Sequence, residues 1–408
     1  MPDASWLQNQ SPAFRLMVAT SWLAPESWRP RQEQTIRELV EPDPDWDRYL
    51  QLVERHRTPA IAWTALQRVE GIRIPQPVRE QLQQCSRSAR QQAARFSLLL
   101  AQALQALERA AIPVMPMKGQ LLSLDLYGDL GLRQSHDIDL ACKTADIERA
   151  YHVLEETGWQ PNPIARAFVH DFTPRQKQEY LRYEHDLSFT HRSGAILELM
   201  WRDVGETTEA TNRRWQASHT AVWNNCSYQV LADSDLIHYL CTHGERHAWF
   251  RVKWLGDLAR LHADGRIDWQ ACLGEAQDLG QRRMLLASLS TLVTLYGFSW
   301  PGIDMRLQPK LPTFLLRCNL RAMTAFNYSP YSPVNWIYTL ANLIKSHRID
   351  RYIKPHYSFK EWLLEYSFRG PDYMVLRLPD RYFWMYRLLR PFLFVWRRIA
   401  PTAPIHPE

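Results

Sequence analysis

The sequence predicts an α+β protein in which a small mixed sheet is embedded between helical N- and C-terminal regions. Apolar residues recur at three- and four-residue steps over 46–69 and 78–110, a period typical of amphipathic helices. A helical period returns after residue 233. Between these regions, short apolar or alternating runs bounded by turn residues indicate strands, at 112–117, 137–141, 185–190 and 195–201.

The composition is that of a globular protein and excludes a largely disordered chain. Of 408 residues, 46% are hydrophobic and 23% are charged, so several domains with a sizeable core are expected. The net charge of +6 is compatible with nucleotides, nucleic acid or acidic lipid headgroups and does not select among them. Six cysteines without a C-x-x-C pair, no secretory signal and no apolar run of about 20 residues predict a cytoplasmic protein that is at most membrane-peripheral.

The N-terminal region, residues 1–110, is expected to be helical. Pro75 and Pro77 separate its two periodic stretches. The second stretch leads directly into residues 112–117, a run suited to a buried strand.

An α/β core is expected over residues 111–230. A helix over 120–127 ends at Gly128, because glycine commonly follows the last helical residue. After the next strand, Thr144 is expected to cap a helix that stops at Gly158.

The second half of the core is expected to hold two paired strands. Residues 161–180 are rich in Arg, Gln and His and suggest a polar insertion. The strands at 185–190 and 195–201 follow, and the turn residues at 191–194 between them indicate a hairpin.

Two further regions complete the predicted organisation, a helical accessory domain over 231–345 and an aromatic, basic segment over 346–408. The end of that segment, 380–398, interleaves Arg with Trp, Phe and Leu. Such a helix is compatible with peripheral contact to an anionic membrane surface or with stacking on nucleic acid. It equally fits a helix that packs its aromatic side chains on the protein and leaves Arg in solvent.

The strand at 137–141 carries two acids at a spacing of two. Side chains at i and i+2 of a strand point to the same side, so Asp137 and Asp139 are expected to face one point in space. Two such carboxylates suit a hard divalent cation, Mg²⁺ or Mn²⁺, and the alternative is a solvated strand face. The other Asp-x-Asp groups of the chain precede helical patterns, where Asp caps a helix or complements its dipole.

Glu198 is the expected third member of this cluster. It is a single acid in the otherwise apolar run 195–201, and a lone acid in such a place usually has a partner. If the strands at 137–141 and 195–201 are neighbours, three carboxylates meet, enough to hold two Mg²⁺ ions for in-line displacement at phosphorus. The alternative is an exposed acid on an edge strand.

Lys118, Gly119 and Arg133 are the candidate phosphate ligands. Gly119 permits close approach of the backbone to a phosphate, and the helix that follows offers free N–H groups. Lys118 can supply a point charge to the phosphates. Arg133 can clamp a phosphate bidentately, or it can pair with Asp129 as a structural bridge.

These features together carry a family resemblance. Lys118-Gly119, Leu126-Tyr127-Gly128, Arg133, Asp137-Ile-Asp139-Leu140, His185-x-Leu187 and Leu197-Glu198-Leu-x-Trp201 occur in this order. The chain resembles, over roughly residues 30–350, the bacterial uncharacterised nucleotidyltransferase family of the DNA polymerase β-like superfamily.

The resemblance implies a nucleotidyltransferase core with a Mg²⁺-dependent, two-metal mechanism. Such an enzyme binds an NTP such as ATP, transfers the nucleoside monophosphate to an acceptor and releases pyrophosphate. The superfamily's phosphate turn and three acids fall on Gly119, Asp137, Asp139 and Glu198. Two departures stand out, since Gln120 follows the turn glycine where the superfamily usually has Gly or Ser, and Met200 stands where the branch often has His.

A second group of residues is expected to line a substrate cleft. His243 and His247 lie one helical turn apart in His243-Gly-Glu-Arg-His247, whose order is not that of a zinc protease. With Arg251 and Asp257 they are expected to face the carboxylates, while helix-packing histidines are the alternative. His185 beside the strand can bind substrate or order Glu198, or it can be a hydrogen-bonded histidine at the sheet edge.

The sequence thus favours a metal-dependent nucleotidyltransferase whose acceptor it leaves unidentified. The alternative is a non-catalytic nucleotide-binding or assembly protein, for example in polysaccharide or natural-product biosynthesis, that retains the fold. A third possibility is RNA binding or RNA-end modification, which predicts a strongly salt-dependent affinity for RNA.

Overall fold

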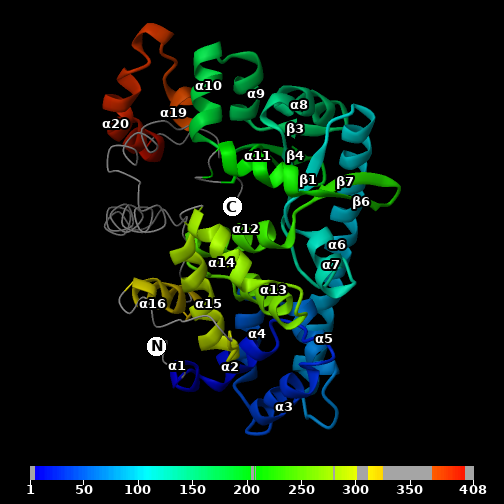
Figure 1. Cartoon of the computed structure of the whole chain (residues 1–408). Coiled ribbons are helices and arrows are strands. Elements are labelled where there is room, and N and C mark those ends of the chain that lie inside the picture. The colour runs from blue at the N-terminus through cyan, green and yellow to red at the C-terminus, as the bar shows by residue number, and fades with distance from the viewer. Residues whose placement is uncertain are drawn as a thin grey trace. The chain divides into compact units, whose positions relative to one another are not determined.

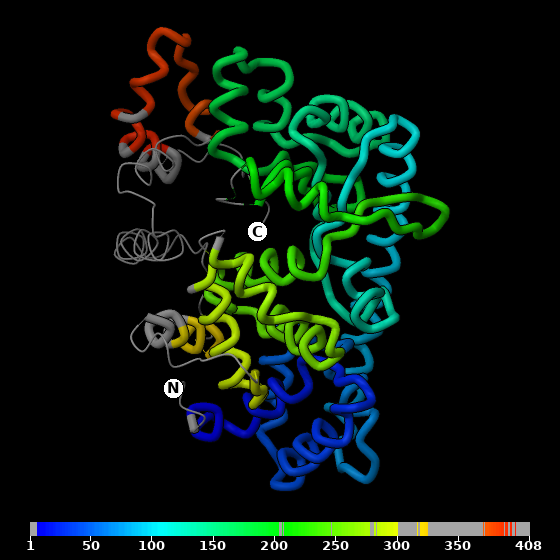
Figure 2. Tube along the Cα trace, in the orientation of Figure 1, coloured from blue at the N-terminus to red at the C-terminus, as the bar shows by residue number. Residues whose placement is uncertain are grey.

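The computed structural model describes residues 5–203, 206, 208–278, 281–300, 311–324 and 370–399 (Figure 1). The chain divides into two compact units, each built from three stretches. We call the first the helical unit; it takes its described residues from Met1–Ser97, Gln120–Ser135 and Ala232–Pro355. We call the second the sheet unit; it takes them from Leu98–Gly119, His136–Leu231 and His356–Glu408. The path of the chain can be followed in Figure 2.

The described elements of the helical unit are all helices. They are α1 (Ser5–Gln8), α2 (Pro12–Ala19), α3 (Arg29–Val40), α4 (Trp46–Arg55), α5 (Pro59–Gln67), α7 (Gln120–Tyr127), α12 (Asp233–Arg246), α13 (Val252–Ala263), α14 (Trp269–Asp278), α15 (Arg282–Tyr296) and α16 (Leu311–Thr324). The long helix α6 (Gln76–Arg109) contributes to both units, because the division falls between Ser97 and Leu98.

The sheet unit combines strands with shorter helices. Its elements are β1 (Val114–Pro116), β2 (Asp137–Cys142), the 3₁₀ turn η1 (Thr144–Asp146), α8 (Ile147–Glu156), β3 (Trp159–Pro161), α9 (Pro163–His170), α10 (Pro174–Tyr183), β4 (Asp186–His191), β5 (Ile196–Met200), α11 (Thr208–Ala217), β6 (His219–Trp223), β7 (Cys226–Val230), α19 (Gly370–Val375), η2 (Asp380–Tyr382) and α20 (Met385–Ile399). The prediction of an α+β chain with a small mixed sheet is confirmed.

Two helices replace the predicted polar insertion at 161–180. The side chain of Asn162 accepts a hydrogen bond from Ala165 N at the start of α9, and Thr173 forms a capping box with Gln176 at the start of α10. The prediction of a Thr144 cap is also wrong, because Thr144 begins η1 and α8 starts three residues later.

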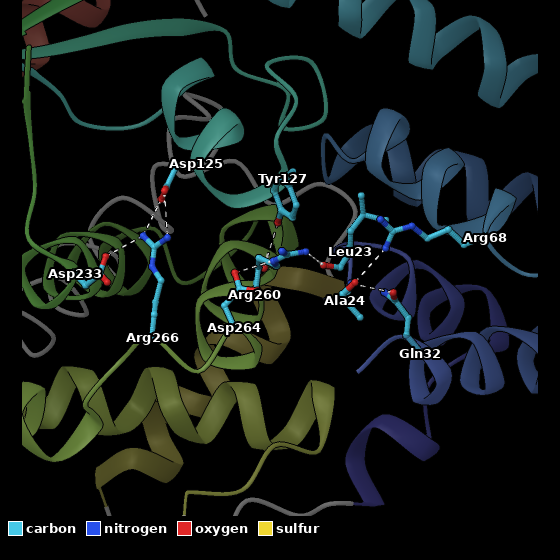
Figure 3. Close-up of polar contacts among 11 residues, drawn as sticks. Leu23, Ala24, Gln32, Arg68, Asp125, Tyr127, Asp233, Arg260, Asp264 and Arg266 are labelled. Carbon is cyan, nitrogen blue, oxygen red and sulfur yellow. Dashed lines mark hydrogen bonds and ion pairs between the residues drawn. The ribbon is translucent and has the colours of Figure 1, made fainter. Parts of the chain in front are cut away.

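In the helical unit, α7 has polar contacts with α13 and with Arg266 in the segment between α13 and α14, which also pairs with α12 (Figure 3). Arg266 pairs with Asp125 of α7 at 2.8 Å and with Asp233 of α12 at 2.9 Å. The guanidinium of Arg260 on α13 lies 5.9 Å from the centre of the Tyr127 ring. The prediction of a helix over 120–127 is confirmed by α7. Gly128 follows this helix with φ of +69°, which glycine adopts at little cost.

The main sheet of the sheet unit has the strand order β1-β2-β5-β4-β3. β2 and β5 are parallel, while the other neighbouring strands are antiparallel. Helix α8 packs against β3, and α9 packs against β3 and β4 (Figure 1). The hairpin β6–β7 forms a separate two-stranded sheet whose β7 contacts β1.

The two central strands bury one of their faces. Ile138 and Leu140 of β2 and Leu197 and Leu199 of β5 are at most 3% exposed. Burial of four such side chains stabilises the sheet by roughly 1.5–3 kcal/mol each. Alternation of side chains along a strand then places the acids of β2 and Glu198 of β5 on the opposite face.

Within the described ranges, no helix has the combined length and apolar character needed to cross a bilayer.

Candidate active site

Asp137 and Asp139 begin the central strand β2. β1 pairs with β2 up to Pro116–Leu140, and Met117 N extends the pairing by donating to Asp139 O at 3.1 Å. The side chain of Asp137 is 33% exposed, whereas that of Asp139 is 1% exposed. One carboxylate is thus at the rim of the site and the other is buried within it.

Glu198 joins this pair through the parallel pairing of β2 and β5. Glu198 lies opposite Asp139 in the strand register. One carboxylate oxygen from each of Asp137, Asp139 and Glu198 lies within 4.8 Å of the other two. Among the residues that the structure describes, this is the one group of three side chains with the spacing of metal ligands.

Lys118 lies against the same carboxylates. Its Nζ donates a hydrogen bond to Asp139 Oδ1 at 3.0 Å and lies 3.7 Å from Asp137 Oδ2. The next residue, Gly119, has φ of +85°, a left-handed conformation that glycine adopts without strain. The Lys-Gly turn therefore brings an ammonium to the acids before the chain enters α7.

Burial and repulsion between neighbouring acids make Asp139 and Glu198 hard to ionise. Burial, followed by the charge of Asp137, raises the pKa of Asp139 well above its usual range, and Lys118 opposes that rise. Burial and then the charge of Asp186 raise the pKa of Glu198 to about 7. A cluster of this kind is stabilised by any cation that lies among its oxygens.

Asp186 is a member of the site that the sequence analysis missed. In the β4–β5 pairing Ser188 lies opposite Glu198, and Asp186 is two residues earlier on the same face of β4. His185 Nε2 lies 3.3 Å from Asp186 Oδ1. The sequence contained the information needed to find Asp186. Side chains alternate along a strand, so in a strand that pairs with the strand of Glu198, Asp186 shares a face with Ser188.

The three carboxylates fit a divalent metal ion. Asp139 Oδ2 is buried and accepts no hydrogen bond, although Lys118 Nζ is 3.0 Å away. A buried carboxylate oxygen that accepts no hydrogen bond has a lone pair available for a bond to a metal. All three candidate ligands are hard oxygens, which hard divalent cations prefer.

Arg133 forms a buried ion pair in the helical unit. Its Nε lies 2.8 Å from Asp257 Oδ2 on α13, and both side chains are at most 2% exposed. Burial raises the pKa of Asp257, and Arg133 opposes that rise. The structural bridge suggested by the sequence is thus present with a different acid, since Asp129 pairs with Arg90.

His243 and His247 belong to an aromatic cluster in the helical unit. Their ring centres are 4.8 Å apart, and Trp254 lies 4.8 Å from the first and 5.6 Å from the second. Arg251 precedes α13 and its guanidinium lies 4.9 Å from the centre of the Phe250 ring.

The residues between the two histidines have structural roles. A Cβ on Gly244 would lie 2.3 Å from the indole of Trp249, so only glycine allows this ring to pack on α12. Trp249 Nε1 in turn donates to Glu245 Oε1 at 2.9 Å. Burial raises the pKa of Glu245 to about 7, and the hydrogen bonds from Trp249, Asn319 and Ser288 oppose that rise.

The sequence-derived candidates therefore form two groups. Lys118 and the three acids of the cluster are together in the sheet unit, with His185 beside Asp186, whereas Arg133, Asp257, Arg251 and the two histidines belong to the helical unit. The predicted cleft that would combine members of both groups stays a prediction.

Comparison with models of protein families gives a match. The model of the family described as Uncharacterised nucleotidyltransferase matches residues 42–297, more than half of the chain. No curated protein and no solved structure matches.

Proposed function

We propose that this chain, which belongs to the uncharacterised nucleotidyltransferase family, transfers a nucleoside monophosphate from an NTP to an acceptor and releases pyrophosphate. The observation that carries the proposal is the meeting of Asp137, Asp139 and Glu198 on two parallel strands. A three-carboxylate site of hard oxygen ligands is suited to phosphoryl chemistry with Mg²⁺ or Mn²⁺.

Each residue of the cluster receives a role in this proposal. Asp137, Asp139 and Glu198 would hold the metal, which when bound stabilises charge on the phosphates. Lys118 and the backbone at Gly119 would bind the triphosphate, because an ammonium and free N–H groups both favour phosphate oxygens.

The reaction itself is a displacement at the α-phosphorus. The acceptor oxygen forms a bond to that phosphorus, the bond to the bridging oxygen breaks, and pyrophosphate leaves with it. The acceptor proton passes to a base. We assign this base to Glu198, because its half-buried carboxylate lies beside those of Asp137 and Asp139, where the acceptor would meet the metal-bound nucleotide.

The test uses the full chain with each of the four NTPs, labelled at the α-phosphate, and Mg²⁺ or Mn²⁺. Added acceptors are sugar phosphates, RNA and proteins of a cell extract. We expect transfer of the label together with pyrophosphate release, and we expect a chelator to abolish both. The absence of pyrophosphate release with every acceptor, together with NTP binding that persists unchanged in Asp137→Ala/Asp139→Ala, would instead identify a non-catalytic nucleotide-binding protein.

Helix α20 supports a second proposal, peripheral contact with an anionic membrane surface. Leu388, Phe392 and Trp396 follow one another at four-residue steps and are 64%, 72% and 59% exposed, so they form one apolar face. Residues 381–399 contain five arginines and no acid. A basic helix with an exposed apolar face is the pattern of a segment that lies in the headgroup region of a bilayer.

Removing this apolar face is expected to weaken vesicle binding. The doubly substituted variant Phe392→Ser/Trp396→Ser should bind vesicles that contain phosphatidylserine about tenfold more weakly in a sedimentation assay, because the apolar area buried in the bilayer is lost. Val222→Ser is the control, since Val222 is 71% exposed on β6 of the same unit. Equal binding by wild type and by the double variant would contradict the proposal.

A further inference from the structure

The ammonium of Lys118 occupies the position of a counter-ion among the carboxylates. Its Nζ lies 3.0 Å from each oxygen of Asp139 and 3.7 Å from Asp137 Oδ2. The Lys118 side chain is 10% exposed and that of Asp139 is 1% exposed, so solvent screens this contact little. The ammonium and the carboxylate of Asp139 thus form a largely buried ion pair.

The same oxygens are the ligands that the proposed function assigns to the divalent ion. A metal bound to Asp139 would share the carboxylate with an ammonium in direct contact with it, and two cations at such a distance repel. The cluster has three acids, so one ammonium leaves it incompletely neutralised. The three carboxylates therefore favour a divalent ion over the single charge of the ammonium, which that ion would displace.

The position of Lys118 in the chain allows its ammonium to move from the carboxylates to a bound phosphate. It lies after β1 and before α7, in the turn with Gly119, and not in a strand. Its charge is at the end of a flexible four-carbon chain with three rotatable donors. Phosphate oxygens of a bound nucleotide offer the displaced ammonium a new partner.

We infer that Lys118 is a resident counter-ion that competes with the divalent cation for Asp137 and Asp139 and passes to the triphosphate when that cation binds. This inference rests on the proposed function, because it concerns the same site. Cation binding and nucleotide binding would then strengthen one another. The cation releases Lys118 toward the triphosphate, and the triphosphate holds Lys118 away from the carboxylates.

The test measures cation binding directly, with Mn²⁺ as the probe and electron paramagnetic resonance or calorimetry as the readout, at mildly alkaline pH and without nucleotide. Lys118→Met removes the charge and keeps the length of the side chain. We expect the variant to bind Mn²⁺ about tenfold more tightly than wild type, because a competing cation is gone. We expect it to bind a non-hydrolysable NTP analogue about tenfold more weakly, because one phosphate contact is lost.

Two further variants serve as controls. Lys118→Arg retains the positive charge and should bind Mn²⁺ within about twofold of wild type. Lys177→Met makes the same chemical change in the sheet unit, where Lys177 pairs with Glu148 outside the carboxylate cluster, and it should leave both affinities unchanged. In wild type the analogue should tighten Mn²⁺ binding, and this enhancement should shrink in Lys118→Met.

The outcomes separate this inference from the proposed function. Unchanged or weaker Mn²⁺ binding in Lys118→Met, while wild type binds the ion, would overturn the inference alone and make Lys118 a positioning group for Asp139. A failure of wild type and all variants to bind Mn²⁺ would overturn both, because the carboxylates would then not form a metal site. Melting curves of each variant show whether it is folded, and Lys118→Arg provides a second test of the role of charge.

Discussion

Replacing Asp139 by asparagine is expected to lower the rate of nucleotidyl transfer by about a thousandfold or more, because a metal-based stabilisation of several kcal/mol is lost. Asp139 is the most buried of the three acids and lies opposite Glu198 in the strand register. Asparagine has the same shape but lacks the negative charge that a divalent ion requires. Label transfer from an NTP and Mn²⁺ binding are the measurements, and both should fall together.

The same substitution should leave the folded state intact. Burial raises the pKa of Asp139, so the ionised side chain is unfavourable in the fold and a neutral amide relieves that cost. A melting temperature equal to or above that of wild type is expected without metal. Asp171→Asn is the matched control, because Asp171 is 41% exposed in the sheet unit and pairs with Arg377. Full transfer activity in Asp139→Asn would contradict the assigned role.

Replacing Arg133 by methionine is expected to lower the free energy of unfolding by about 3–5 kcal/mol, because it leaves the charge of Asp257 buried without its partner. Both side chains are almost inaccessible to water and their charged atoms are 2.8 Å apart. The double variant Arg133→Met/Asp257→Leu should recover much of that loss, since it removes both charges from the core. Denaturant unfolding of wild type and of these two variants measures the effect.

Arg90 provides the matched control for this experiment. It pairs with Asp129 in the same unit, but its side chain is 43% exposed, so Arg90→Met should cost less than about 1 kcal/mol. The result also separates two roles of Arg133. A loss of nucleotide affinity with an unchanged free energy of unfolding would support the phosphate clamp that the sequence suggested and would contradict a mainly structural role.

Much of the carboxylate cluster could be predicted from local pattern alone. Alternation along β2 gave the shared face of Asp137 and Asp139, and a single acid in an apolar run gave Glu198. The step that local pattern cannot supply is the pairing of two strands that are far apart in the chain. That pairing was an assumption in the sequence analysis, and the parallel register of β2 and β5 confirms it.

Other parts of the fold were missed for identifiable reasons. The region 161–180 was interpreted from its many Arg, Gln and His residues, although Ile164, Ala167 and Phe168 follow a helical spacing and the capping signals at Asn162 and Thr173 were present. The strands β6 and β7 are short; β6 is largely exposed and β7 is mostly half-buried, so the hairpin has little apolar alternation to detect.

The role of the segment around His243 depends on tertiary contacts that a sequence does not display. Gly244 is required because the ring of Trp249 packs directly on it. The backbone turns back toward α12 at Ala248 and Trp249, which both have positive φ. The spacing of His243 and His247 predicts that they share a helix face, whereas contacts with Trp249 explain Gly244 and Glu245 between them. A motif of this kind contains structural and candidate functional residues side by side.

The pairing of β2 with β5 also has a consequence for how the sheet assembles. A one-residue slip of β5 would turn Glu198 into the apolar layer, and Leu197 and Leu199 would face the carboxylates. Such a mispaired sheet would bury an uncompensated charge and would also lose a ligand. Affinity for a divalent ion therefore doubles as a probe of correct strand alignment, and it can distinguish properly assembled protein from compact but misaligned chains during refolding.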